Sequence, residues 1–404
     1  MAAGKAAEAG AQVTLLEKTE RLGKKLGITG KGRCNLTNTI DVKGFIENFP
    51  GNGHFLYGAL YRFGNKELMS FFRTLGVDLK VERGMRVFPT SDTSKDILDA
   101  LKDYIHSNSV NVSYLTRAKE IIVKDGAVKG VVTYDGRIFY GEAVILATGG
   151  SSYPGTGSTG DGYEIARQIG HTITPLRPSL VPLECEEDWV ELVNGLSLKN
   201  VTLSVFYEDK LIDSEFGEML FTNFGVSGPI VLTLSEKVSL ILQNSISSVK
   251  LIINLKPALT PEELDARLQR DFTLFANRQF KNALDRLLPQ SFIPVFLCLS
   301  QIPTDKKVNQ ITKEERRKLV TLLQGIPLTV KKARPLREAI VTAGGVSTQE
   351  INPKTMESRL VRGLFFAGEV IDIHGNTGGY NLQAAFSTGY LGGVNSAEYS
   401  LFSH

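Results

Sequence analysis

The stretch from Gly363 to Gly389, GLFFAGEVIDIHGNTGGYNLQAAFSTG, has the composition of a strand, an acidic turn and the start of a helix. Leu364 to Ala367 is a short apolar run that ends at Gly368, which predicts a buried strand stopping where backbone approaches a ligand. Glu369 and Asp372 then place carboxylates at the carboxyl end of this strand. There they can accept hydrogen bonds from a chain of hydroxyl groups.

The second half of the same stretch predicts a helix with an uncovered N-terminus. Gly378 and Gly379 precede the run from Tyr380 to Phe386, whose small and apolar residues suit a closely packed helix. Glycines leave the first N–H groups of such a helix open, and the helix dipole adds roughly half a positive charge there. An anion is therefore favoured, either a pyrophosphate or the N1/C2=O edge of a reduced flavin. The alternative is an ordinary strand, turn and capped helix.

The composition indicates a soluble, globular protein of two or three domains. The chain has 404 residues, of which 42% are hydrophobic and 22% charged, enough for a large core. It has no run of about eighteen apolar residues, the length that indicates a membrane helix. Its first residues, MAAGKAAEAGAQ, lack the apolar core of a secretory signal. We therefore expect a cytoplasmic protein without a membrane partner; the oligomeric state is left open.

Cysteine and histidine spacing argues against disulfides and metals. The three cysteines, Cys34, Cys185 and Cys298, are far apart and form no CxxC pair, so neither a disulfide framework nor a zinc site is predicted. None of the five histidines belongs to an HxxxH or HxH pair. We therefore expect reduced thiols and no metal.

Positive charge is concentrated late in the chain. Between Gln301 and Ile340 there are ten lysines and arginines against four acids. This excess predicts a patch that faces phosphates, as on RNA. The alternative is a solvated helix face on which Glu314 and Glu315 pair with Lys318.

The N-terminal residues fit the second half of a Rossmann-type βαβ unit. Ala2 to Ala9 predicts a helix, and Gln12 to Leu16 predicts a strand that ends at Glu17 and Lys18. A carboxylate at this position normally takes the adenosine ribose, about twenty residues after the first glycine of a GxGxxG loop. Counting back places that loop before Met1. We therefore expect the natural gene product to begin roughly twenty residues earlier.

Two further glycine-rich segments bear on the same site. The apolar strand Ala143 to Leu146 runs into Ala147-Thr148-Gly149-Gly150, where backbone can approach a dinucleotide. Gly155 to Gly160 reads GTGSTG, but it follows the loop Ser151 to Pro154, and no strand ending in an acid comes about twenty residues later. We interpret it as a substrate-side or flavin-edge loop and not as a second NAD(P) fingerprint. Its helix is expected at Asp161 to Ile169.

The middle of the chain predicts an insertion into the nucleotide-binding domain. From about Arg177, alternating strands and Gly/Pro turns indicate a small barrel or sandwich. Thr260-Pro261-Glu262-Glu263 then opens a helical stretch, with a capping residue followed by proline at the first helical position. The join of the two parts is where a substrate cleft is expected.

Seven motifs in order carry a family resemblance. They are TGKGRCNLTN (Thr29 to Asn38), ATGG, TGSTGDGY (Thr156 to Tyr163), GEMLFTNFGVSGP (Gly217 to Pro229), TAGGV (Thr342 to Val346), KTMESRL, and AGEVID with TGGYNLQ. Over essentially the whole chain they resemble the BaiN/YhiN-type flavoproteins, also called aminoacetone-oxidase-family proteins.

The resemblance implies an α/β fold in which a Rossmann-like FAD-binding domain (glutathione-reductase-like) is interrupted by a β-barrel domain that carries a helical subdomain. The FAD-binding domain is expected at 1–176 and 347–404, the β-barrel-like domain at 177–256 and 326–346, and the helical subdomain at 257–325. The chain departs from the family at two places. The first strand and a GGGPAG-like loop are missing at its start, and Asn223 stands where many relatives have the histidine of FTHxGxSGP. A proton-transfer role of that histidine is therefore not carried over.

Relatives are credited with reducing carbon–carbon double bonds, in bile-acid-type enones for one branch and in a ribosomal RNA uridine for another. The resemblance implies an FAD-dependent oxidoreductase that uses NAD(P)H to reduce its flavin and then a double bond in a bulky unsaturated substrate, with ribosomal RNA as a candidate partner. Two alternatives stay open. One is an RNA-binding protein whose flavin is structural or absent, and the other is a flavin-dependent amine oxidase.

The resemblance also implies which residues meet the cofactor. Those expected to bind FAD are Glu17, Lys18, Lys24, Gly32, Arg33, Asn35, Ala118, Thr148, Gly149, Gly150, Gly368, Glu369, Asp372, Gly379, Tyr380, Asn381 and Leu382.

Two residues are candidates for the proton donor. Cys34 is flanked by Arg33 and Lys31, which can tune the pKa of its thiol, and His374 lies in the acidic turn. The alternatives are a packing residue for Cys34 and a solvent-facing turn residue for His374. The tyrosines are further candidate acids, namely Tyr153, Tyr163 and Tyr380.

Overall fold

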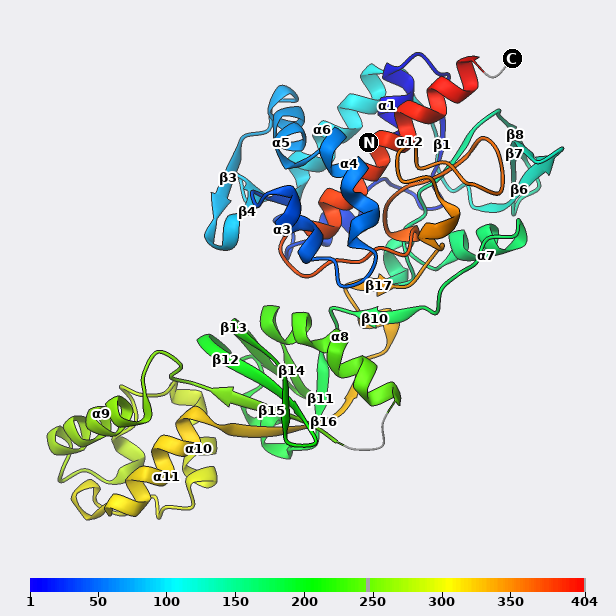
Figure 1. The fold of residues 1–404 in the computed structure, drawn as a ribbon. Coiled ribbons are helices and arrows are strands. Elements are labelled where there is room, and N and C mark those ends of the chain that lie inside the picture. The colour runs from blue at the N-terminus through cyan, green and yellow to red at the C-terminus, as the bar shows by residue number, and fades with distance from the viewer. Residues whose placement is uncertain (245–247, 403–404) are drawn as a thin grey trace. The chain divides into compact units, whose positions relative to one another are not determined.

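The chain forms two compact units, which are described one at a time. Unit 1 comprises Met1–Ser179 and Ala339–His404, and unit 2 comprises Leu180–Glu338. The computed structural model in Figure 1 describes residues 1–244 and 248–402. The sequence predicts the boundaries of the FAD-binding domain between 176 and 177 and between 346 and 347. The strands at 177–179 and 341–343 pair with each other and are part of unit 1.

Unit 1 contains two pairs of parallel strands, and three of these four strands, β1, β9 and β18, lie where the sequence predicts strands. β1 (Thr14–Leu16) pairs in parallel with β5 (Asn111–Ser113), and β9 (Val144–Leu146) pairs in parallel with β18 (Leu364–Phe366). The whole of β18 is buried, as its apolar composition requires. Because parallel strands end at the same edge, the residues that follow β9 and β18 are brought together.

The last helix of the chain is central to unit 1. α12 (Tyr380–Phe402) contacts β18, β9 and α1 (Ala2–Glu8), and Figure 1 shows it in red beside the dark blue α1. The contact with α1 depends on small residues. A Cβ at Gly393 would lie 2.5 Å from the carbonyl oxygen of Ala2, so only glycine lets the two helices approach so closely.

The remaining elements of unit 1 surround these strands. Two three-stranded antiparallel sheets are present, one of order β2-β4-β3 and one of order β6-β7-β8. The elements are α2 (Lys24–Ile28), β2 (Thr37–Asn38), α3 (Val42–Glu47), α4 (Tyr57–Arg62), α5 (Asn65–Thr74), β3 (Leu79–Glu82), β4 (Arg86–Pro89), α6 (Ser94–Ser107), β6 (Ala118–Lys124), β7 (Ala127–Thr133), β8 (Ile138–Tyr140), α7 (Asp161–Gln168), β10 (Arg177–Ser179) and β17 (Val341–Ala343).

Unit 2 is built on a closed barrel of strand order β11-β14-β13-β12-β15-β16. Alternate residues of each strand point inward, and in β12 these are Val201, Leu203 and Val205, all buried. Of the barrel and the sandwich that the sequence left open, the strands therefore form the barrel. Its elements are β11 (Leu183–Cys185), β12 (Ser197–Tyr207), β13 (Lys210–Thr222), β14 (Gly225–Ser227), α8 (Pro229–Asn244), β15 (Val249–Asn254) and β16 (Ile326–Ala333).

The helices inserted between β15 and β16 share the core of the barrel. They are α9 (Pro261–Leu274), α10 (Ile293–Ser300) and α11 (Lys313–Gln324). Phe292, just before α10, stacks on Phe221 of β13 with ring centroids 6.0 Å apart. Buried side chains of barrel and helices thus form one hydrophobic cluster. The predicted cap of α9 is confirmed, since the Thr260 hydroxyl accepts a hydrogen bond from the N–H of Glu263.

Part of the basic excess in this region is neutralised by ion pairs. Arg316 Nε lies 2.6 Å from Asp265 Oδ1, and Lys306 Nζ lies 2.7 Å from Glu315 Oε1. Glu315 therefore pairs with Lys306 and not, as the alternative had it, with Lys318. Arg317 and Lys318 are exposed on α11.

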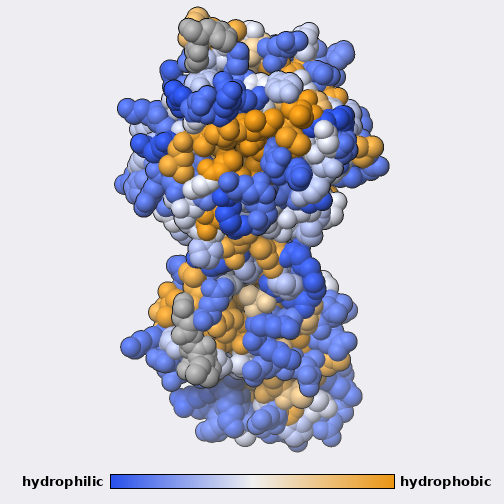
Figure 2. Space-filling model, turned by 90° about the vertical axis from the view of Figure 1, so that its right-hand side faces the viewer, coloured by the Kyte–Doolittle hydropathy of each residue, from blue (hydrophilic) through white to orange (hydrophobic). Residues whose placement is uncertain are grey.

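Hydropathy is uneven over the surface of unit 1. Figure 2 shows one face on which hydrophobic residues gather in a band with hydrophilic residues around it. Contiguous apolar surface of this kind marks places where proteins bind ligands or other chains. Within residues 1–244 and 248–402, no helix combines the length and the apolar character needed to cross a membrane.

A buried polar cluster ties the end of α7 to the segment before β18. His171, whose side chain is 0% exposed, has Nδ1 3.1 Å from Glu350 Oε2 and Nε2 2.9 Å from Ser358 Oγ. Burial lowers the pKa of His171, and the charge and hydrogen bond of Glu350 raise it only in part. The neutral imidazole is therefore the form that the fold favours.

We expect unit 1 to lose stability as the pH falls below 6.5, the ordinary pKa of histidine. A folded-state pKa below the unfolded value means that the unfolded chain binds the proton more tightly, at up to about 1.4 kcal/mol per pH unit. The stability that His171 contributes is fully present above the pKa of the unfolded state. It is lost as the pH falls from that value to the pKa of the folded state. Urea unfolding at about pH 7.5 and about pH 5 measures this change.

Two variants make this measurement specific. His171→Gln should flatten the pH dependence of the urea midpoint, whereas His106→Gln, at an exposed position on α6, should leave it unchanged. Burial by itself raises the pKa of Glu350, but hydrogen bonds from Thr172 outweigh it and lower the pKa. The stability that Glu350 contributes is therefore lost only below pH 4.5, outside the range that is measured. A midpoint that stays constant between about pH 7.5 and about pH 5 in the unaltered chain would contradict the prediction.

Candidate functional site

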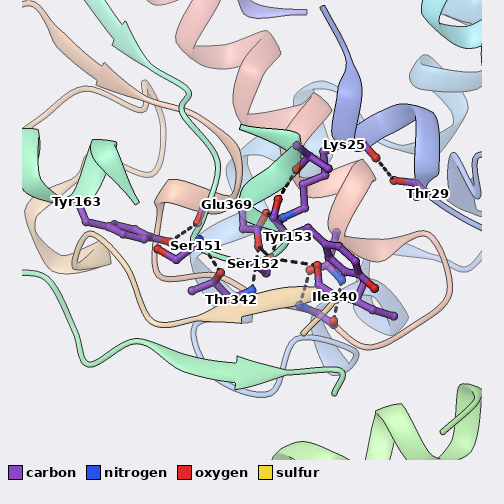
Figure 3. A network of polar contacts seen from close by, with 12 residues as sticks. Lys25, Thr29, Ser151, Ser152, Tyr153, Tyr163, Ile340, Thr342 and Glu369 are labelled. Atoms are coloured by element: carbon purple, nitrogen blue, oxygen red, sulfur yellow. Dashed lines mark hydrogen bonds and ion pairs between the residues drawn. The ribbon is translucent and has the colours of Figure 1, made fainter. Parts of the chain in front are cut away.

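Glu369 is the centre of a polar network at the carboxyl ends of β9 and β18. Its Oε1 accepts hydrogen bonds from the Thr342 N–H at 2.8 Å and from the Ser152 hydroxyl at 3.2 Å. Its Oε2 lies 2.7 Å from Nζ of Lys25. Figure 3 shows these side chains converging from separate parts of unit 1. One carboxylate thus joins four segments that are far apart in the sequence.

Gly150, the last residue of ATGG, is held against this network. A Cβ at this position would lie 2.5 Å from Thr342 Oγ1 and 2.8 Å from Glu369 Oε1. The next residue is fixed by the same partner, because the N–H of Ser151 donates to Thr342 Oγ1 at 2.9 Å. Thr148 is exposed and Gly149 partly exposed just after β9, of which only Leu146 is buried. Backbone is therefore open to a ligand where the sequence predicts it.

Lys25, and not Lys24, provides the positive charge that pairs with Glu369. Lys24 Nζ lies 3.4 Å from Oε1 of Glu20, whose side chain is 71% exposed. Lys25 also donates to the Ser152 hydroxyl at 2.8 Å. Our prediction of Lys24 as a cofactor residue stays untested, and Lys25 is the neighbour that the structure places beside Glu369.

A second group of residues lies at the carboxyl end of β1. Glu17 Oε1 accepts the N–H of Thr19 at 2.7 Å, and Lys18 Nζ lies 3.0 Å from Asp161 Oδ2. Arg117, next to Ala118 at the start of β6, donates twice to Asp161, each time at 2.9 Å. Burial by itself raises the pKa of Asp161, but hydrogen bonds from Arg117, Thr159 and Lys18 outweigh it and keep the pKa low. Asp161 is therefore a charged anchor between Lys18 and Arg117.

The GTGSTG loop is brought to the same place. A Cβ at Gly157 would lie 3.3 Å from Cγ2 of Thr19 and 3.6 Å from Cε of Lys18. Thr159, in the same loop, accepts a hydrogen bond from Lys18 at 2.5 Å. The loop thus lies beside the two residues expected at the adenosine ribose. The predicted helix after it is confirmed as α7.

The segment between α2 and β2 forms a third group. Gly30, Lys31, Gly32 and Cys34 all have positive φ, between 60° and 83°. Such runs of left-handed residues, strained for Lys31 and Cys34, recur where backbone amides face a ligand. Oδ1 of Asn35 is buried with no hydrogen-bond partner among the described residues. An unpaired buried acceptor calls for a donor from outside the protein.

Arg33 is held by acidic neighbours. Its guanidinium forms ion pairs with Glu82 and Asp92 and lies over the ring of Phe88, 4.2 Å from the centroid. The hydrogen bonds that Arg33 donates to Glu82 and Asp92 raise the pKa of Arg33. Its positive charge is therefore already shared with two carboxylates.

Cys34 is 0% exposed and lies in an apolar cluster with Leu36, Phe63 and Phe72. Burial raises the pKa of its thiol to about 12. Since a proton donor must reach substrate and exchange its proton with solvent, this environment favours the alternative interpretation of Cys34 as a packing residue.

We expect native protein to show one rapidly reacting thiol out of three. Cys298 is exposed, whereas Cys34 and Cys185 are buried, and burial raises the pKa of both to about 12. Titration with a chromogenic disulfide before and after denaturation measures the two classes. Cys298→Ser should remove the fast phase and Cys185→Ser should leave it. A second fast thiol that disappears in Cys34→Ser would instead favour Cys34 as a proton donor.

The start of α12 forms a fourth group. Gly379 has φ 97°, and a Cβ there would lie 2.4 Å from the carbonyl oxygen of Thr37 in β2. Tyr380 is buried and packs edge-on against Phe45 at 5.3 Å. The Asn381 side chain closes the preceding turn, because its Oδ1 accepts from the Gly375 N–H at 2.8 Å. Leu382 is partly buried beside it. The side chains of Tyr380 and Asn381 thus contact other parts of the protein, and the backbone at the start of α12 is the part that can contact a ligand.

The acidic turn before this helix is also well anchored. Asp372 accepts a hydrogen bond from Asn52 Nδ2 at 3.0 Å, and Gly368, with φ 74°, donates its N–H to the Thr388 hydroxyl at 2.9 Å. His374 is 5% exposed, so the interpretation as a solvent-facing turn residue is wrong. It lies close to Gly51, where a Cβ would be 3.7 Å from His374 Cε1.

The structure also separates the three candidate tyrosines. Tyr163 and Tyr380 are buried, and the Tyr163 hydroxyl donates to the carbonyl oxygen of Glu369 at 3.2 Å. Tyr153 is 39% exposed and has φ 52°, a conformation that is rare for an aromatic residue. Tyr153 is thus the tyrosine with a ring open to a substrate.

The predicted residues are therefore brought together in four groups in unit 1. Sequence reasoning missed Lys25, Ser152 and Thr342, which complete the Glu369 network. Thr342 belongs to the TAGGV motif, and Ser152 follows the ATGG motif by two residues. The presence of these two motifs together with AGEVID, which contains Glu369, was the available sequence signal. No group of three or more side chains suited to hold a metal ion occurs among the described residues.

The parallel strands, the glycine-led ends of β9 and β18, and the start of α12 define a Rossmann-type domain of the FAD-binding class. The chain belongs to the family described as HI0933-like protein Rossmann domain, which matches residues 1–395. The BaiN/YhiN-type resemblance is thereby confirmed. As a member the chain is an enzyme, an FAD-dependent oxidoreductase.

Two curated relatives span nearly the whole chain. It is 32% identical over 389 residues to the 3-dehydro-bile acid delta(4,6)-reductase of Clostridium scindens, covering 96% of this chain and 93% of that enzyme. It is 31% identical over 392 residues to the ribosomal RNA dihydrouridine synthase of Escherichia coli, covering 95% and 92%.

Solved structures share the fold at low identity. A 3-ketosteroid delta1-dehydrogenase from Sterolibacterium denitrificans has a TM-score of 0.55 at 12% identity, covering 98% of this chain and 97% of that one. A quinol-fumarate reductase has a TM-score of 0.54 at 16% identity, covering 100% and 69%.

Proposed function

We propose that this chain binds FAD in unit 1 and uses NAD(P)H to reduce a carbon–carbon double bond conjugated to a carbonyl in a bulky substrate. The observation that carries the proposal is membership of a family with two curated relatives of this chemistry. One is a bile-acid reductase and the other forms dihydrouridine in ribosomal RNA. A ribosomal RNA substrate would place the chain in the cytoplasm, as the sequence predicts.

The residues of unit 1 fit such a cofactor. Asn35 Oδ1 needs an external donor, and FAD offers N–H and hydroxyl donors. Glu17 and Lys18 would meet the adenosine ribose. The Glu369 network would hold the middle of the dinucleotide, with Thr148 to Gly150 in backbone contact. Gly379 to Leu382 would place the helix N-terminus at the flavin edge.

The cofactor supplies hydride chemistry when bound, and the protein supplies position and a proton. The ion pair with Lys25 orients Glu369, so that the carboxylate can accept hydrogen bonds from ligand hydroxyl groups. Of the two proposed proton donors, we favour His374 over Cys34. Both side chains are buried, but the imidazole lies in the turn that leads into α12, at the proposed flavin edge, whereas the Cys34 thiol lies in an apolar cluster.

Anaerobic spectroscopy tests the proposed function. Purified protein should show flavin absorbance that bleaches on addition of NADH or NADPH and returns on addition of a steroid enone or a uridine-containing RNA. Bound flavin that neither nicotinamide reduces would refute the reductase. Bleaching of the flavin by added small amines without any nicotinamide, followed by reoxidation when oxygen is admitted, would instead support the amine oxidase.

A further inference from the structure

Three aromatic rings form an exposed row on unit 1, from the 3₁₀ turn at Gly53–Leu56 onto α4. The ring centroids of His54 and Tyr57 are 5.7 Å apart, and those of Tyr57 and Tyr61 are 6.3 Å apart at an angle of 19°. Tyr61 is 73% exposed and Tyr57 is 37% exposed. We call this set, His54, Tyr57 and Tyr61, the aromatic row. Large rings stacked side by side in solvent bury little area within the protein, so they are available to an external ring.

The aromatic row starts beside the candidate site. Asn52, two residues before His54, donates from Nδ2 to the carbonyl oxygen of Asp372 at 2.9 Å. Gly51 lies against His374, since a Cβ there would be 3.7 Å from Cε1 of that ring. The row therefore leads away from the turn proposed to face the flavin edge and the substrate.

One flank of the aromatic row is basic. Gly58 faces the segment that bears Lys354, because a Cβ at Gly58 would lie 2.9 Å from the Pro353 carbonyl oxygen and 3.9 Å from Lys354 Cα. Arg62, four residues after Gly58, lies on the same side of α4. In the part of the chain that the structure describes, neither Arg62 nor Lys354 takes part in an ion pair.

The acids that follow Arg62 and Lys354 in the sequence are already engaged. Glu357, three residues after Lys354, accepts the N–H of Gly363 at 3.1 Å. Glu67 Oε2 accepts the N–H of Gly64 at 3.0 Å and caps α5. Lys66, next to it, is exposed and is likewise in no ion pair among the described residues. The flank thus keeps positive charge available for phosphates.

We infer that the aromatic row and its basic flank, Arg62, Lys66 and Lys354, bind single-stranded RNA next to the site of reduction. Stacked aromatic rings beside unpaired cations are the combination that single strands require, since bases stack on the rings while phosphates meet the cations. The inference rests on the RNA arm of the proposed function. It names the surface that would hold the nucleotides flanking the reacting uridine.

Binding of a fluorescent oligouridylate to the flavin-loaded protein tests this inference. Tyr61→Ala should weaken binding about ten-fold, because one stacking ring is lost, whereas Tyr61→Phe should stay within about two-fold. Tyr140→Ala is the matched control, since Tyr140 is 81% exposed on β8 and outside the row, and it should bind like the unaltered protein. Arg62→Ala with Lys354→Ala should make binding less dependent on salt, with Arg73→Ala on α5 as control.

The outcomes also separate this inference from the proposed function, if NAD(P)H-driven reduction of a steroid enone is measured on the same variants. Equal RNA binding by Tyr61→Ala and Tyr140→Ala overturns the inference. An enone KM that rises in Tyr61→Ala while RNA binding is unchanged also overturns it, and assigns the rings to an apolar ligand. If RNA binding depends on Tyr61 but the protein has no reductase activity, the RNA-binding surface is supported and the proposed reaction is refuted.

Discussion

Glu369→Gln should lower the free energy of unfolding of unit 1 by about 2 kcal/mol and reduce the flavin content of purified protein. The amide can still accept the N–H of Thr342, but its NH₂ group then faces the Lys25 ammonium, donor against donor. The ion pair of 2.7 Å is lost in a place where the two side chains are only 28% and 20% exposed. Urea unfolding and the flavin-to-protein absorbance ratio measure the two effects.

A double-mutant cycle isolates the pair. Lys25→Met should be destabilising alone but should cost little in combination with Glu369→Gln, because removing both partners leaves no unpaired charge. The neighbouring pair of Lys24 and Glu20 gives the control. Since Glu20 is 71% exposed, Glu20→Gln should change stability by less than about 0.5 kcal/mol. Additive effects of the Lys25 and Glu369 substitutions would contradict the role given to the network.

Gly379→Ala should be more damaging, at roughly 4 kcal/mol, and should abolish flavin binding. The backbone at φ 97° is strained for alanine, and the new methyl group would lie 2.4 Å from the carbonyl oxygen of Thr37. The carbonyl group of Thr37 belongs to the backbone and cannot move aside as a flexible side chain can. The start of α12 must therefore move away from β2. Thermal unfolding and flavin content again provide the measurement.

Gly170→Ala is the matched control for this substitution. Gly170 has φ 96°, and nothing lies within 4 Å of a Cβ built there. It therefore suffers the conformational strain without the clash, and we expect a loss of about 1 kcal/mol with normal flavin content. If both variants lose the same stability, close packing of α12 on β2 is not what fixes the turn.

The sequence predicted the elements that depend on local pattern. The strands near 143–146 and 364–367, the helix after the GTGSTG loop and the cap at Thr260 all follow from apolar runs, glycines and capping residues, and the structure has them. The family followed from motifs in order. These features are encoded within a few residues, so one sequence is sufficient to recognise them.

The sequence did not predict which side chains meet across segments. Lys24 and Lys25 are adjacent in a short helix, and only the position of β18 selects Lys25 as the partner of Glu369. Cys34 follows Arg33 in a basic-looking loop, yet the left-handed conformation at φ 61° turns its thiol into the apolar cluster. A turn residue such as His374 is usually solvent-facing, but the fold leaves this side chain only 5% exposed. Such contacts depend on tertiary packing, which periodicity does not contain.

The order in which the two units are completed has a consequence for synthesis on the ribosome. Unit 2 is one continuous stretch, whereas unit 1 needs both Met1–Ser179 and Ala339–His404. Unit 2 can therefore finish folding while the first part of unit 1 still lacks β18, α12 and Glu369. Until those residues emerge, the apolar faces that α12 covers stay exposed in the nascent chain. We expect chaperones to engage this chain chiefly during that interval.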